Sequence, residues 1–321
     1  MKRYKKIVLK VDEGIFFDVL EKKEEGLVIK IGNKTNNETS TLELTSPSNP
    51  DHKELAGKHV HYLHKLGRKS NYMKPPIPDH YEYVEGKWNR GFVIRNKRDG
   101  SEFVWVPVGS LEANGTLDGE HFDQQFGRRN YCGDDFSEKG YYEPMTEEFK
   151  RQCESVKKYG GFYISRYDIS RSIQRGKPQS IKGEYPWTSV TQNEAIKIAG
   201  AMENDSELIS SHLLWASEYD SVLEWFIESG KKTEREVCFK HNKCTNQLYR
   251  TGQKKAWEVN AICDFSENVW KWTQERYHRA RGEVVVRGSD YDIHAQAGRR
   301  WAVNSCDAWC GSGFRSALYI K

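Results

Sequence analysis

Cysteine and histidine side chains occur at three places where their spacing could bind a metal ion or carry thiol chemistry. Residues 238–244 read Cys-x-x-His-x-x-Cys, but a closed structural zinc site needs a fourth ligand, which the neighbouring residues do not supply. Residues 59–64 read His-x-His-x-x-His, which allows a metal site, but a solvated strand is the simpler explanation of this pattern. Cys306 and Cys310 could form a copper-binding or redox pair, although ordinary thiols are the simpler interpretation. None of these patterns identifies an active site by itself.

The segment from residue 290 to residue 312 has a composition that favours ligand binding. It mixes aromatic side chains with short polar ones, and no helical or alternating period organises them. Rigid aromatics give contact area at a small cost in entropy, and short polar groups give adaptable hydrogen bonds. An ordinary exposed loop is the alternative. The residues that we expect to contact a protein or cell-surface ligand are Asp290, Tyr291, Asp292, Ile293, His294, Gln296, Arg299, Trp301, Asn304, Asp307 and Trp309.

The chain has 321 residues, which is enough for one large domain and one small domain. Short β-branched or aromatic runs predict a small β-rich module over residues 1–66. The runs that predict its strands are residues 4–11, 26–31 and 59–63. A basic stretch that ends in three prolines predicts a linker over residues 67–80, because proline favours extended backbone. The second domain then covers residues 81–321.

Hydrophobic runs and capping patterns predict a mixture of strands and helices in the second domain. The expected elements are antiparallel strands at residues 81–84, 91–95 and 102–108, a hairpin turn at 97–100, a helix at 146–158 and a strand at 161–168. Thr191 and Glu194 form a capping-box pattern that predicts the start of another helix. Ser217 predicts the start of a third helix, which Gly230 ends. Beyond residue 230 we expect turns and short extended pieces.

From residue 81 onward the sequence resembles the formylglycine-generating enzyme family, also called the sulfatase-modifying-factor domain. Each motif is weak alone, and the resemblance depends on the order and spacing of all of them. The motifs are Phe103–Val108, Gly161–Asp168, Pro186–Thr191, His212–Trp215, Asn260–Thr273, Val286–Ser289 and Gly313–Arg315. The resemblance implies an α+β chain with a C-type-lectin-like fold of the formylglycine-generating-enzyme type and much irregular backbone.

The resemblance implies enzyme activity only where two catalytic cysteines are present. In the family these cysteines follow an Arg-Gly-Gly-Ser motif, and their thiolates bind copper, for which soft sulfur ligands are required. The corresponding stretch here, residues 287–300, contains no cysteine. We therefore expect a protein that is not an enzyme and requires no cofactor. The alternative is a copper- and thiol-dependent oxidase of the formylglycine-generating type that acts on a protein cysteine.

The resemblance also allows a structural calcium ion, because family members often hold calcium near positions matched here by Asn260, Asp264 and Asn268. Hard oxygen ligands of this kind suit calcium. Two substitutions depart from the family pattern. Glu267 stands where the family usually has glycine, and Lys271 stands where it usually has glutamate. The lysine puts a cation where the family has a possible ligand.

The same scaffold is used, with variation at the same C-terminal position, by the variable proteins of diversity-generating retroelements. There a reverse transcriptase rewrites adenine positions, and the affected codons encode mainly Asn, Asp, Tyr, His, Ser, Gly, Ala, Arg, Ile or Cys. Nearly every residue between 290 and 310 is of these types. The resemblance therefore implies a non-catalytic, receptor-type or adhesin-type protein with a diversifiable surface at residues 290–312, as in phage receptor-binding proteins.

Charge and hydropathy exclude several other classes of protein. Lysine and arginine number 50 against 46 aspartates and glutamates, an excess too small to indicate nucleic-acid binding. The basic N-terminal stretch is followed by only a short apolar run, and a secretory signal needs roughly 7–15 apolar residues. No run approaches the ~20 apolar residues of a membrane span. We expect a cytoplasmic product without a signal peptide or membrane insertion, whose N-terminal module could join a phage particle or form a homo-oligomer.

Overall fold

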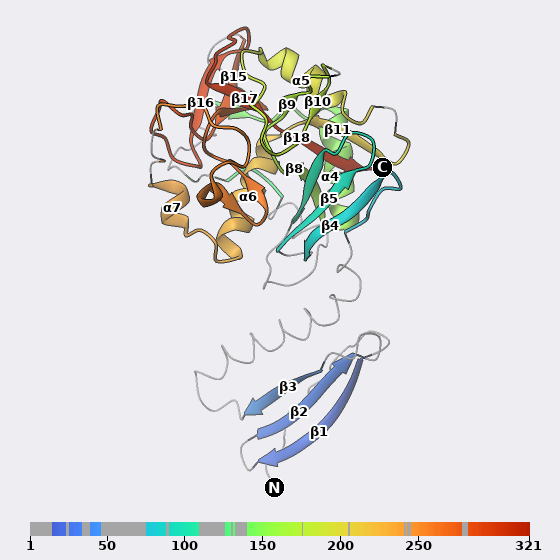
Figure 1. Cartoon of the computed structure of the whole chain (residues 1–321). Helices are drawn as coiled ribbons and strands as arrows, with labels where there is room; N and C mark the ends of the chain where they lie inside the picture. The colour runs from blue at the N-terminus through green and yellow to red at the C-terminus, as the bar shows by residue number, and fades with distance from the viewer. Residues whose placement is uncertain are drawn as a thin grey trace. The chain divides into compact units, whose positions relative to one another are not determined.

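The structure is a computed structural model of the whole chain, and its described residues form two compact units, one before residue 75 and one from Pro75 onward (Figure 1). The described residues are 15–23, 26–33, 39–45, 75–87, 90–108, 126–129, 131, 140–174, 176–204, 206–240, 242, 245–277 and 282–321. Of the predicted linker, residues 67–74 lie outside this set. Residues 75–80 belong to the second unit, where the Pro76 carbonyl accepts a hydrogen bond from the Tyr163 hydroxyl.

The first unit contains a three-stranded antiparallel sheet in the order β1-β2-β3. Its strands are β1 (Ile15–Lys23), β2 (Gly26–Asn33) and β3 (Thr39–Thr45). The prediction of a strand at residues 26–31 agrees with β2, and β1 and β3 were not predicted. The other two predicted strands, at residues 4–11 and 59–63, lie outside the described residues.

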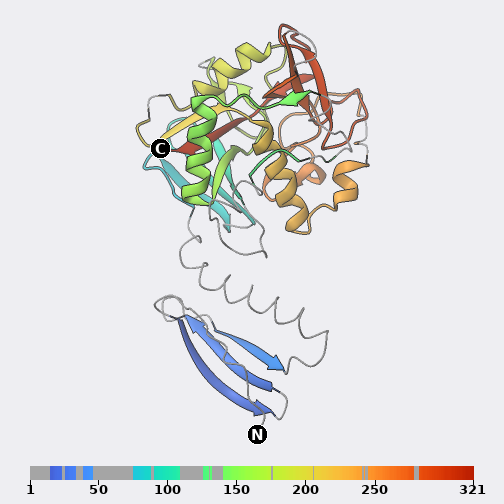
Figure 2. The same ribbon diagram turned by 180° about the vertical axis from the view of Figure 1, so that it is seen from behind.

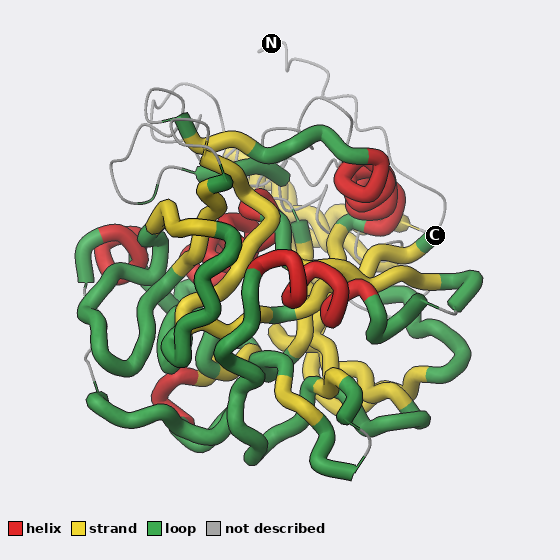
Figure 3. The backbone as a smooth tube through the Cα atoms, turned by 90° about the horizontal axis from the view of Figure 1, so that it is seen from above, coloured by secondary structure: helices red, strands yellow, loops and turns green. Residues whose placement is uncertain are grey.

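The second unit is of the α+β class, with helices and mainly antiparallel strands. Its elements, in chain order, are β4 (Tyr81–Lys87), β5 (Arg90–Asn96), β6 (Glu102–Pro107), β7 (Tyr141–Tyr142), α4 (Glu147–Tyr159), β8 (Gly161–Ser165), β9 (Ser170–Arg171), β10 (Pro178–Gln179), α5 (Gln192–Gly200), β11 (Ile209–Leu213), α6 (Ala216–Glu228), α7 (Glu234–Cys238), η1 (Lys255–Trp257), β12 (Glu258–Val259), β13 (Ile262–Cys263), β14 (Trp270–Tyr277), β15 (Glu283–Arg287), β16 (Arg300–Asn304), β17 (Ser312–Phe314) and β18 (Ser316–Ile320). Figure 3 shows that long loops connect these elements, as expected for an irregular backbone.

Two sheets organise the second unit. One is a six-stranded antiparallel sheet with the order β11-β18-β8-β6-β5-β4. The other is a five-stranded sheet in which four strands have the order β16-β15-β14-β17 and the fifth, β7, pairs with β14. The last strand, β18, lies inside the six-stranded sheet and pairs with β11 on one side and β8 on the other, so the sheet is complete only when the C-terminal segment is in place. Figure 2 shows α4 lying across the face of the sheet that β8 and β18 help to form.

Three clusters of buried apolar side chains make the core of the second unit. One lies between the six-stranded sheet and helices α4 and α6. A second lies between α5 and the five-stranded sheet, and contains Trp270 and Trp272 of β14. A third packs residues such as Trp105 and Tyr163 together. Both sheets are therefore anchored in the core, and burial of this area is the main term that stabilises the unit.

The helix starts follow the capping residues, with one correction. Thr146 caps α4 by accepting the Phe149 N–H, and Thr191 and Glu194 form the predicted capping box of α5. The prediction that Ser217 begins the third helix is wrong, because α6 starts at Ala216. The Glu218 carboxylate accepts the N–H of the preceding cap residue, so the acidic side chain in the first turn, and not Ser217, satisfies the helix start.

A second correction concerns the chain beyond residue 230, where we expected turns and short extended pieces. The structure has the short helix α7, which Thr233 and Glu236 close with a capping box, and the eight-residue strand β14. The helix α7 escaped prediction because it is too short to show a helical period, and β14 is longer than the short extended pieces expected there. Within the described residues, no helix combines the length and the apolar character needed to cross a bilayer.

Candidate functional site

The surface segment, residues 290–312, is bounded on both sides by strands of the five-stranded sheet. β15 leads into it, and β16 lies within it and pairs with β15 in an antiparallel register. β17 ends it and pairs in parallel with β14. Figure 1 shows β15, β16 and β17 gathered at one end of the second unit. The predicted binding region is therefore attached to a packed sheet at its start, its middle and its end.

Hydrogen bonds between backbone groups hold the loop from residue 290 to residue 299 against a neighbouring part of the chain. The carbonyl of Tyr291 accepts N–H groups from Thr245 at 3.0 Å and Asn246 at 2.9 Å. The carbonyl of Ala295 accepts the N–H of Asn242 at 2.9 Å. Gly298 N donates to Val237 O at 3.2 Å, and farther along the segment the carbonyl of Trp309 accepts the N–H of Ser189 at 3.1 Å. Backbone groups make these bonds, so they do not depend on which side chains the segment carries.

The structure separates the segment into outward-facing and buried positions. None of the predicted contact residues is fully buried: Asp292, Ile293, His294, Arg299, Trp301 and Asn304 are exposed, and Asp290, Tyr291, Gln296, Asp307 and Trp309 are half-buried. The buried positions between them are Ala295, Gly298, Arg300 and Val303. Gly311 and Ser312 are also buried, so the outward-facing part of the predicted 290–312 surface ends at residue 310.

An aromatic patch forms where β16 and the following loop meet β14. The Trp301 indole is 38% exposed and makes an edge-to-face contact with buried Trp270, with ring centroids 5.3 Å apart. Trp309 also lies next to Trp301, with ring centroids 5.7 Å apart. The patch therefore has one ring anchored in the core and two at the surface, the arrangement that gives a rigid hydrophobic contact area.

Two predicted contact residues also shape the loop. The Asp290 carboxylate accepts the N–H groups of Asp292 at 3.0 Å and Ile293 at 2.7 Å, and partial burial raises its pKa. The Asn304 side-chain carbonyl accepts the Cys306 N–H at 3.0 Å and so closes the turn after β16. A substitution at either position would change the loop itself as well as any contact with a ligand.

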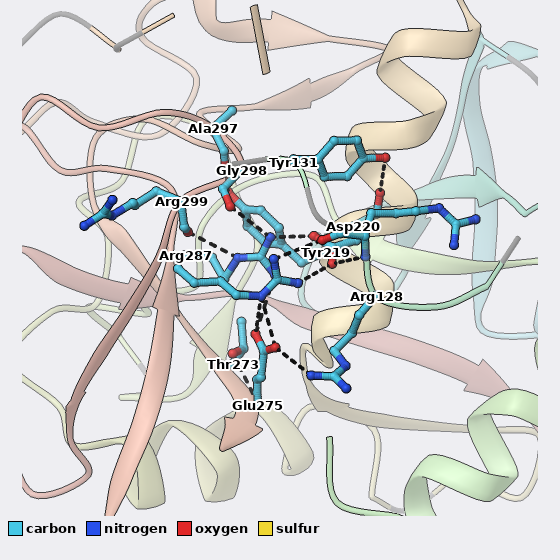
Figure 4. Close-up of polar contacts among 12 residues, drawn as sticks. Arg128, Tyr131, Tyr219, Asp220, Thr273, Glu275, Arg287, Ala297, Gly298 and Arg299 are labelled. Carbon is cyan, nitrogen blue, oxygen red and sulfur yellow. Dashed lines mark hydrogen bonds and ion pairs between the residues drawn. The ribbon is translucent and has the colours of Figure 1, made fainter. Parts of the chain in front are cut away.

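Beneath the segment lies a buried charge cluster of Asp220, Glu275, Arg287 and Arg300 (Figure 4). Arg300 Nε donates to the two carboxylate oxygens of Glu275 at 3.0 and 3.1 Å, and its terminal nitrogen pairs with Asp220. Arg287 also pairs with Asp220, and its guanidinium lies 4.4 Å from the centroid of the Tyr219 ring. Burial opposes ionisation of Asp220, but the two guanidinium groups outweigh it and lower the pKa of that carboxyl.

This cluster ties the segment to three other parts of the fold. Asp220 lies on α6, Glu275 on β14 and Arg287 on β15, whereas Arg300 belongs to the surface segment itself. Arg287 also donates from Nε to the carbonyl of Arg299 at 3.2 Å. Arg300 was not predicted from the sequence, because burial of one of two adjacent arginines has no signal in the composition of the loop.

Of the three cysteine and histidine patterns in the sequence, the described residues include Cys306 and Cys310 but only part of the other two or none. Cys306 and Cys310 are both exposed, and the Tyr291 hydroxyl donates to the Cys310 sulfur at 3.4 Å. In the possible zinc pattern Cys238 is buried, whereas residues 241 and 244 lie outside the described residues. The histidine cluster at residues 59–64 lies outside them as well. Among described residues, no group of three or more histidine, cysteine or acidic side chains could hold a metal ion.

The three residues predicted to bind calcium each make a hydrogen bond to a different part of the chain. Asn260 donates to the Ser229 hydroxyl at 2.9 Å. Asp264 accepts the Gly252 N–H at 2.7 Å, and the Asn268 amide exchanges two hydrogen bonds with the backbone of Tyr249. All three residues have left-handed backbone, with φ of 48°, 56° and 70°. Asn and Asp tolerate this conformation better than other side chains, which explains these residue types without a metal.

One exposed residue next to the surface segment was not predicted from the sequence. Phe239 follows α7 and is 69% exposed. The backbone bonds from Val237 to Gly298 and from Asn242 to Ala295 lie on either side of it in sequence, so it belongs to the strip that borders the surface segment.

Comparison of the chain with protein-family models, with curated proteins and with solved structures gives no match.

Proposed function

We propose that the protein is a non-catalytic ligand-binding protein of the receptor or adhesin type, which displays a diversifiable surface at residues 290–312 on a C-type-lectin scaffold. In this proposal it resembles the variable proteins of diversity-generating retroelements. Its partner is a protein or cell-surface ligand, and neither nucleic acid nor membrane insertion is involved. The N-terminal unit would attach the protein to a phage particle or to other copies of the chain after synthesis in the cytoplasm.

The observation that carries this proposal is the separation of exposed from buried positions within one short segment. Side chains that could contact a ligand face outward, while Ala295, Gly298, Arg300 and Val303 pack inward. The backbone is fixed by main-chain hydrogen bonds and by the charge cluster below. A surface of this kind can change its side chains without losing its shape, which is what a diversified binding site requires.

The chemistry of the segment supports binding over catalysis. The stretch at residues 287–300, where the related enzymes carry copper-binding cysteines, has none. The exposed aromatics and short polar groups are the residue types that supply most of the energy and adaptability in binding sites. Incubation with copper and a Cys-x-Pro-x-Arg peptide should therefore produce no aldehyde, and formation of formylglycine would contradict the proposal.

A library experiment tests the proposed surface without knowledge of the natural ligand. Asp292, Ile293, His294, Arg299 and Trp301 would be randomised together on displayed protein, and the library selected against a model protein such as lysozyme. We expect most members to stay folded and specific binders to be recovered, because these positions are exposed and the segment is held by backbone hydrogen bonds and by the buried charge cluster. A matched control library would randomise buried Ala295, Gly298 and Val303, and most of its members should fail to fold.

Two outcomes of the selection would contradict the proposal. One is equal loss of folded protein in both libraries, which would mean that the exposed side chains hold the loop in place. The other is a well-folded exposed-position library that yields no binder to any of several targets. The gene itself gives a further test: a neighbouring reverse-transcriptase gene and an adenine-rich near-copy of codons 290–310 are expected beside it.

A further inference from the structure

Lys271 is a fully buried lysine at the centre of the sheet that carries the surface segment. It lies on β14, opposite Arg287 of β15 and Gly313 of β17 in the two neighbouring registers. The side chain has no exposed area. A lysine in such a position is uncommon, since moving an ammonium group out of water costs several kcal/mol unless oxygen atoms replace the lost water.

Three oxygen atoms surround the Lys271 ammonium group. Its Nζ donates to the backbone carbonyl of Glu267 at 2.8 Å and to that of Val269 at 2.6 Å, and it lies 3.3 Å from a carboxylate oxygen of Asp168. An ammonium group has three N–H donors, so the number of acceptors matches the number of donors. Carbonyl and carboxylate oxygens are also the ligands that hard metal cations prefer.

The surroundings contain both signs of charge. Arg315 is fully buried and pairs through Nε with the other oxygen of Asp168 at 3.1 Å. Burial raises the pKa of Asp264 to about 7 and also raises the pKa of Glu267. Burial lowers the pKa of Lys271, and the carboxylate of Asp168 opposes this. The group therefore combines two basic side chains with three acidic ones in a space that excludes water.

We propose that the Lys271 ammonium group is the built-in cation of this cluster and takes the place of a structural metal ion. It would hold the Glu267–Val269 turn, β14 and Asp168 together by the same kind of oxygen contacts that a calcium ion makes. A second cation next to it would be repelled by both Lys271 and Arg315. The five-stranded sheet, and with it the candidate surface, is then stable without calcium. This inference does not depend on the proposed ligand-binding function.

The residues expected to bind calcium fit this assignment. Asn260, Asp264 and Asn268 are engaged by neighbouring chain segments, and their left-handed backbone accounts for their identity. One carboxylate oxygen of Asp264 has no hydrogen-bond partner. The positive charges that act on this carboxyl group are those of Arg315 and Lys271. The Lys271 ammonium group thus supplies the positive charge that an ion would otherwise bring to this turn.

The test measures urea unfolding of the full chain by tryptophan fluorescence, with millimolar calcium chloride or with EDTA. For the wild-type protein we expect the same unfolding midpoint in both. Lys271→Met keeps the length of the side chain but removes the charge, and should raise the unfolding equilibrium constant by at least about a hundredfold, as expected when one partner of a buried ion pair is lost. Lys255→Met is the matched control, because Lys255 is 85% exposed, and it should change the constant less than about fivefold.

Three results would overturn the proposal. The first is a wild-type protein that calcium stabilises and EDTA destabilises. The second is calcium that copurifies with the wild-type protein in a one-to-one ratio, measured by elemental analysis. The third is a Lys271→Met variant as stable as the Lys255→Met control. If Lys271→Met is recovered only as unfolded protein while the control folds, the required loss of stability has been observed directly by circular dichroism.

Discussion

Replacement of Arg300 by methionine should destabilise the protein, whereas the same replacement of the adjacent Arg299 should have little effect. Arg300 is buried and bonds to Glu275 and Asp220. Arg299 is exposed, and only its backbone carbonyl takes part in the cluster. The two variants change the same residue type at neighbouring positions, so they differ only in what the side chain touches.

The size of the effect follows from what remains after Arg300 is removed. Loss of one partner from a buried ion pair costs about 3–5 kcal/mol. Asp220 would keep Arg287, and Glu275 would keep Arg287 at 3.7 Å and Arg128 at 3.4 Å, so neither carboxylate is left without a cation. We therefore expect the lower end, about 3 kcal/mol, which for a domain of this size is a fall in melting temperature of roughly 6–12 °C. Arg299→Met should stay within about 0.5 kcal/mol of the wild type.

Thermal and urea unfolding followed by circular dichroism measure both variants. A fall in melting temperature for Arg300→Met alone would support the role of the cluster. Equal stability of the two variants would refute the reasoning, because it would mean that the cluster does not fix the segment. A large loss in Arg299→Met would refute it in another way, by showing that the exposed side chain holds the loop.

Other predictions concern the helix start, the backbone and the pH dependence. Thr191→Ala removes the cap of α5 and should cost about 1 kcal/mol in urea unfolding, while Thr191→Ser should cost less. Gly91 has φ of 73°, and an added Cβ would lie 2.6 Å from the Asn260 carbonyl oxygen, so Gly91→Ala should cost at least ~1 kcal/mol. Burial raises the pKa of Asp264 to about 7, so its contribution to stability is complete at pH below 4 and is lost as the pH rises toward 7. Asparagine also tolerates left-handed backbone, so Asp264→Asn should flatten this decline between pH 4 and pH 7, and an unchanged pH profile would contradict the assignment.

The sequence predicted the elements that have strong local signals. The strands at residues 81–84, 91–95 and 102–108 agree with β4, β5 and β6, because each is a run of β-branched and aromatic residues bounded by turn residues. The helix at residues 146–158 agrees with α4 to within a residue, since Thr146 and Gly160 mark its two ends. Local capping chemistry is short-range and so can be read from neighbouring residues.

The site was harder to predict because its structure depends on contacts between distant segments. The exposed character of residues such as Asp292 and Trp301 follows from composition. The burial of Arg300 does not, since it depends on Asp220 and Glu275, which come from α6 and β14. The same limit applies to Lys271, whose charge was recognised as unusual but whose three oxygen partners come together only in the folded chain.

The two shaping residues restrict how far the surface segment could vary. Asp290 holds two N–H groups of its own turn, and a Cβ added at Gly311 would lie 2.4 Å from its carboxylate. Any longer side chain at residue 290 would therefore press on the chain that enters β17. Asn304 closes the turn after β16 through its side-chain carbonyl, for which aspartate is the nearest replacement. A diversified surface on this scaffold would then keep Asp290 and Asn304 nearly constant while the exposed residues between them change, so that natural variants should differ at residues such as 292–294 and 299 but not at these two.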